Sequence, residues 1–236
     1  MRFSVLVVTR GRPGALRRAL ESVAACEPAP HEVLVVDGDR DAAAEETVSE
    51  LGSSVPFDVT YAVAPPGVSV QRNRGVDLAT GDVIVFLDDD VVVDPGSERD
   101  VEWMQGCFMS GRLGAVRLVP HDERITAEYR GEDEDFSYRL SRLGRLRYVP
   151  GAVVRHEQRG FRGSRGRAFD RRVILVRTYL FRKNFEPSLV TRAQFACLVV
   201  VLFGHRLLNR EWEGAMGILE GVGQVWRRRG RPLLAP

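Results

Sequence analysis

The first ninety residues alternate between short apolar runs and stretches of helical periodicity. Phe3–Val8 is a run of large and β-branched residues, typical of a strand buried on both faces of a parallel sheet. Pro13 suits the first position of a helix, and apolar residues recur at helical spacing from there to residue 25. The alternation then repeats, which predicts strands at 32–36, 59–63 and 83–87 and helices at 42–51 and 69–79. This order predicts a doubly wound α/β sheet with right-handed crossovers.

Polar residues follow the predicted strands at the points where each strand ends. In doubly wound sheets ligands bind beyond the carboxyl ends of the strands, so these residues are the first candidates for a site. The three successive carboxylates at 88–90 repel one another unless a cation is near, although a solvated turn would also account for them. Asp88 and Asp90 can face one crevice, where oxygen ligands suit Mg²⁺ or Mn²⁺. The strand-end residues are Thr9, Arg10, Asp37, Asp39, Asp88, Asp89 and Asp90.

The loop after the first strand excludes two common nucleotide-binding classes. It is TRGRPG at 9–14 and not the G-x-G-x-x-G of a dinucleotide fold, and Pro13 lacks a backbone donor that such a loop needs. The chain also has no G-x-x-x-x-G-K-[ST] motif, so a P-loop is excluded.

The composition is that of a globular protein, with 236 residues of which 44% are hydrophobic and 28% charged. The net charge of +2 hides an uneven distribution, because residues 1–138 hold 13 basic and 26 acidic side chains and residues 139–236 hold 21 and 6. A basic region attracts nucleic acid, anionic lipid or phosphorylated ligands. Since the acidic front half would repel phosphate chains, we expect no nucleic-acid partner.

The cysteines and the apolar runs indicate the cellular compartment. Three cysteines without zinc-type spacing predict a reducing environment and no thiolate metal site. The apolar run near the N-terminus is too short for a signal peptide, so we expect the protein not to be exported. The longest apolar run, 195–204, falls below the roughly 20 residues that cross a bilayer. We therefore expect no transmembrane helix and a cytoplasmic protein.

Four motifs follow one another along the chain: VLVVTRGRP at 5–13, EVLVVDGDRD at 32–41, QRNRGVDLATGDVIVFLDDD at 71–90 and GEDEDFSYRL at 131–140, with YVPGAVVRH after them at 148–156. In this order and spacing they resemble the family-2 glycosyltransferases, a group of inverting enzymes with a GT-A fold. The similarity covers about residues 3–160, and the ordered set is far more specific than any single motif.

The resemblance implies a nucleoside-diphosphate sugar donor (UDP, dTDP or GDP), a divalent metal, Mn²⁺ or Mg²⁺, and inversion at the anomeric carbon. It implies that Asp90 is a metal ligand and that His156 lies near the metal and diphosphate. Mn²⁺ accepts such a mixed oxygen and nitrogen set better than Mg²⁺ does. Without the resemblance, a lone histidine after an apolar strand is more often a structural residue. The nucleotide-sugar contacts that it implies are Thr9, Arg10, Asp37, Asp39, Arg72, Asn73, Asp88 and Asp89.

The acidic residues 132–135 open a predicted helix. Carboxylates at a helix start are favoured by the helix dipole alone, so a structural role is open. The acidic pair of the family maps onto Glu132 and Asp133, and Asp133 is our candidate for the base that takes the proton of an acceptor hydroxyl. Asp135 points about 200° away from Asp133 on a helix, so only one of the two easily serves as base. Glu132 and Asp135 are candidates for acceptor binding, and Asp135 alternatively pairs with Arg139.

The sequence departs from the family pattern at two places. DGDRD at 37–41 replaces the usual D-[DN]-G-S-x-D stretch, which leaves the nucleobase open. Only 15 residues separate Asp90 from Gly106, so we expect a trimmed sheet and an altered acceptor pocket, with a strand still present at 106–112. The GED-x-D form followed by a histidine resembles rhamnosyl- and galactofuranosyltransferase-like members.

Three functions compete. The favoured one is a metal-dependent inverting glycosyltransferase that transfers a sugar to a hydroxyl of a glycan, lipid carrier or small metabolite, as in polysaccharide biosynthesis. The second is a catalytically silent partner subunit that binds sugar nucleotides. The third is a sugar-phosphate nucleotidyltransferase, although the first loop lacks the Gly-rich, Lys-containing phosphate cradle that this would require.

The basic half of the chain predicts a second region. We expect a catalytic domain at 1–160 and an extension at 161–236, joined by an Arg- and Gly-rich loop at 155–172 that is either a solvated linker or a lid over the diphosphate. Apolar helices are predicted at 173–181 and 193–203, and Trp212, Met216, Leu219 and Val222 line one face of another. Such helices pack on the sheet, pair two subunits in a homodimer, or make peripheral contact with the inner face of a membrane.

Overall fold

The structure is a computed structural model of the 236-residue chain. It describes residues 1–39, 43–94, 99–100, 106–126, 128–148, 153–156, 166–228 and 231–234. The chain divides into two compact units, and we treat each by itself. Unit 1 is Met1–Glu123 with Glu132–Arg159, and unit 2 is Arg124–Gly131 with Gly160–Pro236.

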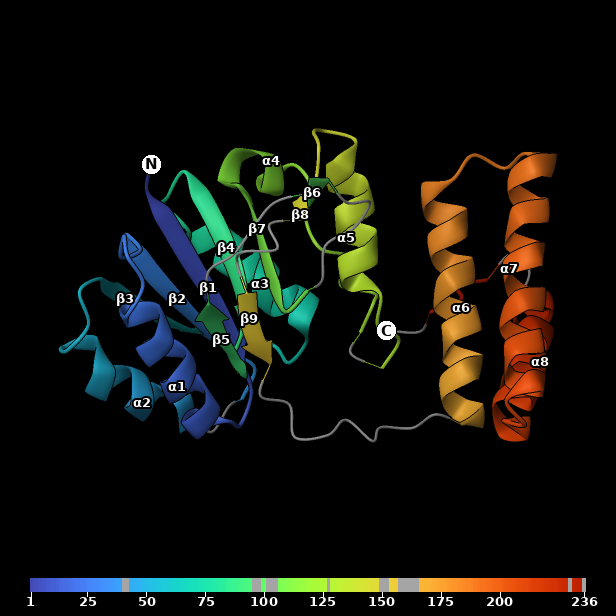
Figure 1. Cartoon of the computed structure of the whole chain (residues 1–236), viewed down its shortest axis with the longest axis horizontal. Helices are drawn as coiled ribbons and strands as arrows, with labels where there is room; N and C mark the ends of the chain where they lie inside the picture. The colour runs from blue at the N-terminus through green and yellow to red at the C-terminus, as the bar shows by residue number, and fades with distance from the viewer. Residues whose placement is uncertain are drawn as a thin grey trace. The chain divides into compact units, whose positions relative to one another are not determined.

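Unit 1 is built on a five-stranded sheet in the order β3-β2-β1-β4-β7, in which only β7 is antiparallel to its neighbour (Figure 1). The predicted α/β sheet is therefore confirmed, and the predicted strands and helices agree with the observed ones to within about two residues. The elements are β1 (Phe3–Thr9), α1 (Pro13–Ala24), β2 (Glu32–Asp37), α2 (Ala43–Gly52), β3 (Asp58–Val63), α3 (Val68–Leu78), β4 (Val83–Asp88), β7 (Phe108–Arg112), α4 (Leu113–Arg117) and α5 (Glu132–Ser141).

Two short antiparallel pairs complete unit 1. β5 (Val91–Asp94) pairs with β9 (Val153–His156), and β6 (Arg99–Asp100) pairs with β8 (Arg147–Tyr148). The shortened segment after Asp90 thus provides two small strands, and its residues 95–98 and 101–105 lie outside the described part of the chain.

Both faces of the sheet are buried, which explains the continuous apolar runs of the sequence. Val5 and Val7 of β1 lie in a core cluster with residues of α1 and α2, whereas Leu6 and Val8 lie in a second cluster with residues of α3, α4 and α5. Gly75 lets α3 approach the sheet closely, because a Cβ there would lie 2.2 Å from a methyl carbon of Leu6. This approach brings the first turns of α3 to the ends of β1 and β4.

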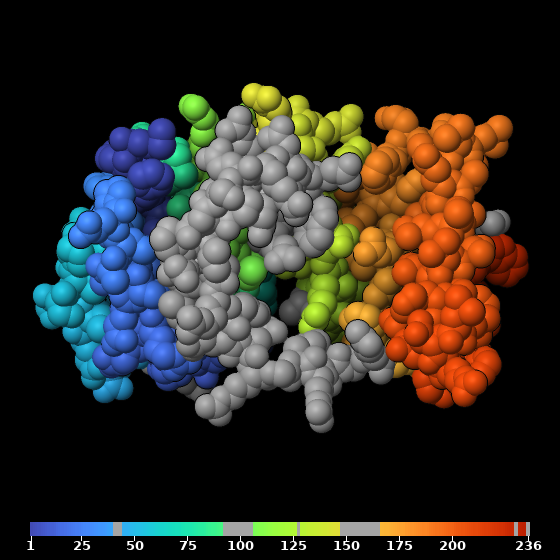
Figure 2. Space-filling model, in the orientation of Figure 1, coloured from blue at the N-terminus to red at the C-terminus, as the bar shows by residue number. Residues whose placement is uncertain are grey.

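Unit 2 contains the helices α6 (Arg167–Asn184), α7 (Leu189–Leu208) and α8 (Trp212–Arg227), which form one block in the space-filling view (Figure 2). α6 and α7 extend beyond the predicted helices, because charged residues interrupt the apolar pattern near their ends, as Arg192 and Arg206 do in α7. The predicted basic loop is shorter than expected, since β9 includes residues 155 and 156 and α6 begins at Arg167. Residues 157–165 of this predicted linker or lid lie outside the described residues.

The contact between α6 and α8 is made through small residues and not through the apolar stripe that the sequence suggested. Gly217 and Gly221 face α6 so closely that a Cβ would lie 2.2 Å from the carbonyl oxygen of Arg167 and 2.7 Å from the Cβ of Ile174. The stripe of larger side chains on α8 is exposed instead. Within unit 2 the glycine side of α8 therefore makes the contact with α6, because the missing side chains permit a closer approach there. The stripe consists of Trp212, Met216, Leu219, Val222 and Trp226.

Candidate active site

The strand ends of β1, β2 and β4 meet at one edge of the sheet, as the sequence predicted. The register pairs Thr9 with Asp37 across β1 and β2, and Val8 with Asp88 across β1 and β4. Because parallel strands share their carboxyl edge, the acidic residues that follow these strands gather there.

Thr9 and Asp89 form the buried centre of this edge. The Thr9 hydroxyl donates to Oδ2 of Asp89 at 2.7 Å, and Nη1 of Arg12 donates to Asp89 Oδ1 at 3.2 Å and to Asp90 Oδ2 at 3.0 Å. Burial raises the pKa of Asp89, while the bonds from Thr9 and Arg12 oppose this rise. Arg12, which was not among the predicted site residues, is 56% exposed, so it holds these two carboxylates from the solvent side.

Asp37 has no exposed surface and organises the loop after β2. Its Oδ1 accepts from the backbone N–H of Asp39 at 2.9 Å, and its Oδ2 accepts from the hydroxyl of Tyr61 at 3.1 Å. Burial and the bond to Asp37 raise the pKa of Tyr61 to about 12. Asp39 is partly buried and Arg10 is exposed, and the contacts of Asp37, Asp39 and Arg10 with a nucleotide stay predictions.

Gln71, in the first turn of α3, fastens the two central strand ends together. Its Nε2 donates to the carbonyl oxygens of Thr9 at 2.8 Å and of Val36 at 2.9 Å. Its Oε1 accepts from Gly67 at 3.3 Å, and a Cβ at Gly38 would lie 2.9 Å from the same oxygen. Gln71 begins one of the sequence motifs but had no predicted role, because an amide on a helix gives no sign of distant carbonyl partners.

Arg72 connects the strand edge to the acidic helix α5. Its side chain is 3% exposed, and Nη2 donates to Asp88 Oδ1 at 3.2 Å and to the carbonyl oxygen of Gly106 at 2.8 Å. Nη1 lies 3.8 Å from Oε1 of Glu132, and the guanidinium lies 5.9 Å from the ring centroid of Phe86. One buried cation therefore serves two carboxylates and a backbone carbonyl that are far apart in the sequence.

Gly106 continues this connection to Asp133. The backbone N–H of Gly106 donates to Asp133 Oδ2 at 3.0 Å, and Asp133 Oδ1 accepts from the N–H of Glu134 at 2.9 Å. A Cβ at Gly106 would lie 3.2 Å from Arg72 Nη2 and 3.3 Å from Asp133 Cβ, so the close contact favours glycine. Asp88 and Asp133, 45 positions apart in the sequence, are thus linked through two residues. No pattern in the sequence shows a link made by the backbone of a glycine.

The other carboxylates of α5 differ in their surroundings. Burial raises the pKa of Glu132, and Arg72 opposes the rise. Asp135 is buried and bonds to Arg139 through Nε at 2.8 Å and Nη2 at 2.7 Å. The expected pairing of Asp135 with Arg139 is present, and roles of Glu132 and Asp135 in acceptor binding stay predictions.

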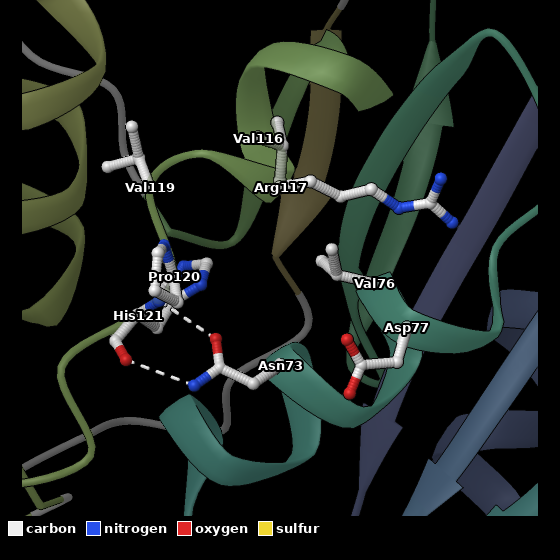
Figure 3. A pocket seen from close by; sticks show the side chains of 8 residues that line it. All are labelled: Asn73, Val76, Asp77, Val116, Arg117, Val119, Pro120 and His121. Carbon is white, nitrogen blue, oxygen red and sulfur yellow. Dashed lines mark hydrogen bonds between the residues drawn. The ribbon is translucent and has the colours of Figure 1, made fainter.

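Asn73 points to the 119–121 segment. Its Oδ1 accepts from the N–H of His121 at 2.8 Å, and its Nδ2 donates to the His121 carbonyl oxygen at 3.0 Å and to Glu123 Oε1 at 2.8 Å. These bonds close one end of a pocket of about 240 Å³ between α3 and the segment after β7 (Figure 3). None of the acidic strand-end residues lines this pocket. Its lining is Asn73, Val76, Asp77, Val116, Arg117, Val119, Pro120 and His121.

The backbone brings the two predicted metal-binding positions together. β5 and β9 pair so that His156 lies opposite Val91, the residue after Asp90. Residue 156 thus lies beside the acidic strand edge, although its side chain is outside the described part of the structure. In the described residues no group of three acidic, histidine or cysteine side chains is arranged to hold a metal. Mg²⁺ sites often use one or two carboxylates together with substrate phosphates, so a single carboxylate such as Asp90 at the strand edge fits such an ion.

A five-stranded, mostly parallel sheet with an antiparallel last strand and an acidic strand edge defines a GT-A fold. Solved structures with this fold are similar to the chain at low identity. The mannosyltransferase PcManGT from Pyrobaculum calidifontis, in complex with GDP-Man and Mn²⁺, matches with a TM-score of 0.62 and 16% identity over 95% of this chain and 86% of that one. TarS from S. aureus, in complex with UDP-GlcNAc, matches with a TM-score of 0.55 and 15% identity over 81% and 69%.

Residues 4–106 match the model of glycosyl transferase family 2. The resemblance inferred from the motifs is therefore confirmed. The succinoglycan biosynthesis protein ExoM of Rhizobium meliloti (strain 1021) is 37% identical over 97 residues, 39% of this chain. The uncharacterized glycosyltransferase YwdF of Bacillus subtilis (strain 168) is 32% identical over 96 residues, 41% of this chain. The matched segments span only 31% and 35% of these two proteins.

Proposed function

We propose that the protein is a metal-dependent glycosyltransferase that moves a sugar from a nucleoside diphosphate to a hydroxyl group with inversion at the anomeric carbon. The observation that carries the proposal is the connection from Asp88 through Arg72 and Gly106 to Asp133. It unites the strand edge, where sheets of this kind bind nucleotides, with a carboxylate suited to act as a base.

Asp133 is the proposed base. Two backbone N–H groups hold its carboxylate, one at each oxygen, and fix its direction while leaving lone pairs for an acceptor hydroxyl. The hydroxyl proton moves to Asp133 as the acceptor oxygen attacks the anomeric carbon, and the bond from that carbon to the diphosphate oxygen breaks with its electron pair on the diphosphate. A single displacement of this kind inverts the configuration. Asp135 is the poorer choice, because it is buried in its bond with Arg139.

The donor would lie along the strand edge. We propose that Thr9, Arg10, Asp37 and Asp39 surround the nucleoside and that Asp88 and Asp89 lie near the ribose. Asp90 and His156 would hold a divalent cation, Mn²⁺ or Mg²⁺, which when bound neutralises the charge of the departing diphosphate. The bound ligands in the names of the similar structures, GDP-Man with Mn²⁺ and UDP-GlcNAc, support this class of donor.

The acceptor and the compartment belong to the same proposal. The name of ExoM points to polysaccharide biosynthesis, so we propose a growing glycan or its lipid carrier as acceptor. The three cysteines are free thiols, which suits a cytoplasmic enzyme.

The first test is a thermal-shift panel of UDP-, dTDP-, GDP- and CMP-sugars, each with and without Mn²⁺. A ligand at 100 times its dissociation constant stabilises the fold by about 2.7 kcal/mol, so one donor class should raise the melting temperature, and more so with Mn²⁺. A panel without any shift contradicts the proposal.

The second test uses the selected donor and measures its hydrolysis or transfer. Asp133→Asn should remove turnover while the thermal shift by the donor is kept, because only the base is lost. Glu134→Gln, one residue further along α5, is the matched control and should retain turnover. Full turnover in Asp133→Asn would exclude this residue as the base, and binding without turnover in the unchanged protein would favour a silent partner subunit.

A further inference from the structure

The helices α7 and α8 of unit 2 leave their apolar faces in solvent. α7 has no buried residue over its 20 positions, and from Ala193 to Gly204 it carries no charged side chain. The exposed fractions of Val200 and Leu208 are 67% and 87%. Exposed apolar surface of this extent is rare on a monomeric protein unless it meets a partner or a membrane.

The exposed stripe of α8 adds tryptophans at both helix ends. Trp212 and Trp226 are each 64% exposed, with Met216, Leu219 and Val222 between them on the same face. The rise of a helix places the two rings about 21 Å apart along the axis. Tryptophan favours the boundary between apolar chains and water, so this arrangement suits a helix that lies in such a boundary.

Basic residues flank these apolar faces. Arg192 lies in the first turn of α7, Arg210 lies in the connection to α8, and Arg227 and Arg228 follow Trp226. Residues 160–236 hold 15 basic and 5 acidic side chains, so the region as a whole is positive. A second copy of the chain would bring like charges together, whereas an anionic lipid surface complements them.

α7 is, by length and composition, apolar enough to cross a bilayer, with a mean hydropathy of 1.3 over its best 18-residue window. Every such window of this helix contains both Arg192 and Arg206, because α7 has only 20 residues. These arginines lie about 21 Å apart along the axis, less than the roughly 30 Å of a hydrocarbon core, so crossing would place charge inside it. Arg206 is also bound to Asp170 of α6 at 2.8 Å, which ties that end of α7 to a polar partner. If α7 lies in the interface between the acyl chains and water, its arginines stay at the headgroups and Arg206 keeps its bond to Asp170.

We propose that the outer faces of α7 and α8 form a docking surface for an anionic lipid bilayer, with the apolar side chains in the acyl boundary and the flanking arginines at the headgroups. The surface consists of Leu189, Val190, Val200, Val201, Leu207, Leu208 and the α8 stripe. The inference does not depend on the proposed catalysis, since it concerns unit 2 alone.

The experiment is flotation of the full-length protein with vesicles of neutral phosphatidylcholine, or of phosphatidylcholine with about one third phosphatidylglycerol. The protein should float with the anionic vesicles, and added salt should weaken the binding. Val200→Asp should reduce the partition coefficient at least tenfold, because it removes an apolar group and adds a repelled charge. Leu118→Asp, at an equally exposed apolar position of unit 1, is the matched control and should bind as the unchanged protein does.

Arg192→Gln and Arg227→Gln should each weaken binding roughly fivefold, and Arg74→Gln in unit 1 should not. Brominated lipid should quench the tryptophan emission, and Trp212→Phe with Trp226→Phe should remove most of that quenching while keeping the apolar stripe. Circular dichroism would verify that each variant is folded. Absence of binding to anionic vesicles, or unchanged binding of Val200→Asp, overturns the proposal. A dimer in solution that Val200→Asp dissociates, without vesicle binding, would assign the surface to a second copy instead.

Discussion

His121 should make the folded protein sensitive to mild acid. Its ring is buried, stacks on Phe136 with centroids 4.1 Å apart and an interplanar angle of 7°, and meets the edge of Phe86 at 5.4 Å. Both ring nitrogens are buried without a hydrogen-bond partner in the described part of the protein. Burial, with the nearby charges of Arg72 and Arg139, holds the pKa of His121 well below its ordinary 6.5.

The sign and size of the effect follow from this shift. At pH 5.5 the unfolded chain binds a proton at residue 121 and the folded chain does not, so stability falls as the pH falls through 6.5. One pH unit below the unfolded pKa corresponds to about 1.4 kcal/mol. His121→Phe cannot titrate and keeps the stacking, so between pH 7.5 and 5.5 it should lose about 1.4 kcal/mol less stability than the unchanged protein. At pH 7.5 it should also be more stable by about 1–3 kcal/mol, because two unsatisfied polar atoms are removed.

Hydrogen exchange of the backbone amides of β4, corrected for the intrinsic rate at each pH, measures the opening of the core that contains Phe86. His121→Gln is the paired control, since it cannot titrate but does not stack, and it should lose the extra pH dependence without the gain at pH 7.5. An identical loss of stability in His121→Phe and the unchanged protein would show that the ring is not held neutral.

Three further substitutions and one matched control test the packing and the site. Gly217→Ala should destabilise unit 2 by about 1–3 kcal/mol, because its Cβ would overlap the Arg167 carbonyl. The control Gly223→Ala, on the same helix, meets nothing within 4 Å and should stabilise unit 2 by up to about 1 kcal/mol. Thermal unfolding followed by tryptophan emission compares the two variants. Gly106→Ala should lower turnover about tenfold with little change in donor affinity, because the new Cβ would lie 3.2–3.3 Å from atoms of Arg72 and Asp133 and would force one of them to move. If the variant and the unchanged protein had equal turnover, Gly106 would have no positioning role. Gln71→Leu should cost about 1–3 kcal/mol in unit 1, measured by exchange of the β1 and β2 amides, because it removes donors from two buried carbonyls.

The strands and their order of alternation could be predicted because both faces of the sheet are buried, and such a sheet requires continuous apolar runs like Phe3–Val8. The helices of unit 2 were harder. Their apolar residues indicated helices but left their roles open, and in the structure the larger side chains of α8 are exposed while its glycines make the contact with α6. The extent of burial of a helix depends on its neighbours, which an amphipathic pattern does not identify.

The candidate site likewise contains residues that the sequence could place and residues that it could not. Strand-end residues such as Thr9, Asp37 and Asp89 could be placed at one edge, because the parallel topology fixes where strand ends lie. Gln71 and Gly106 could not be given their roles, since Gln71 donates to a backbone carbonyl 62 residues away and Gly106 donates its own N–H to a side chain 27 residues away. Asn73 shows the limit of a motif, because a residue adjacent to Arg72 on α3 bonds to His121 and Glu123 and not to the carboxylates of the strand edge.

The two arginines of the acidic edge differ in a way that bears on how a donor would enter. Arg12 is 56% exposed, so water reaches it, whereas the side chains of Asp89 and Asp90 are only 6% and 10% exposed. Arg72 is buried, and removing it would leave Asp88 and Glu132 without their shared cation, a large loss. On the proposed function, another cation can replace Arg12 at Asp90 from the solvent side, and the Arg12 side chain is then available to a diphosphate. Arg72 cannot be exchanged in this way, so it keeps Asp88, Gly106 and Asp133 in one arrangement whether or not the donor is bound.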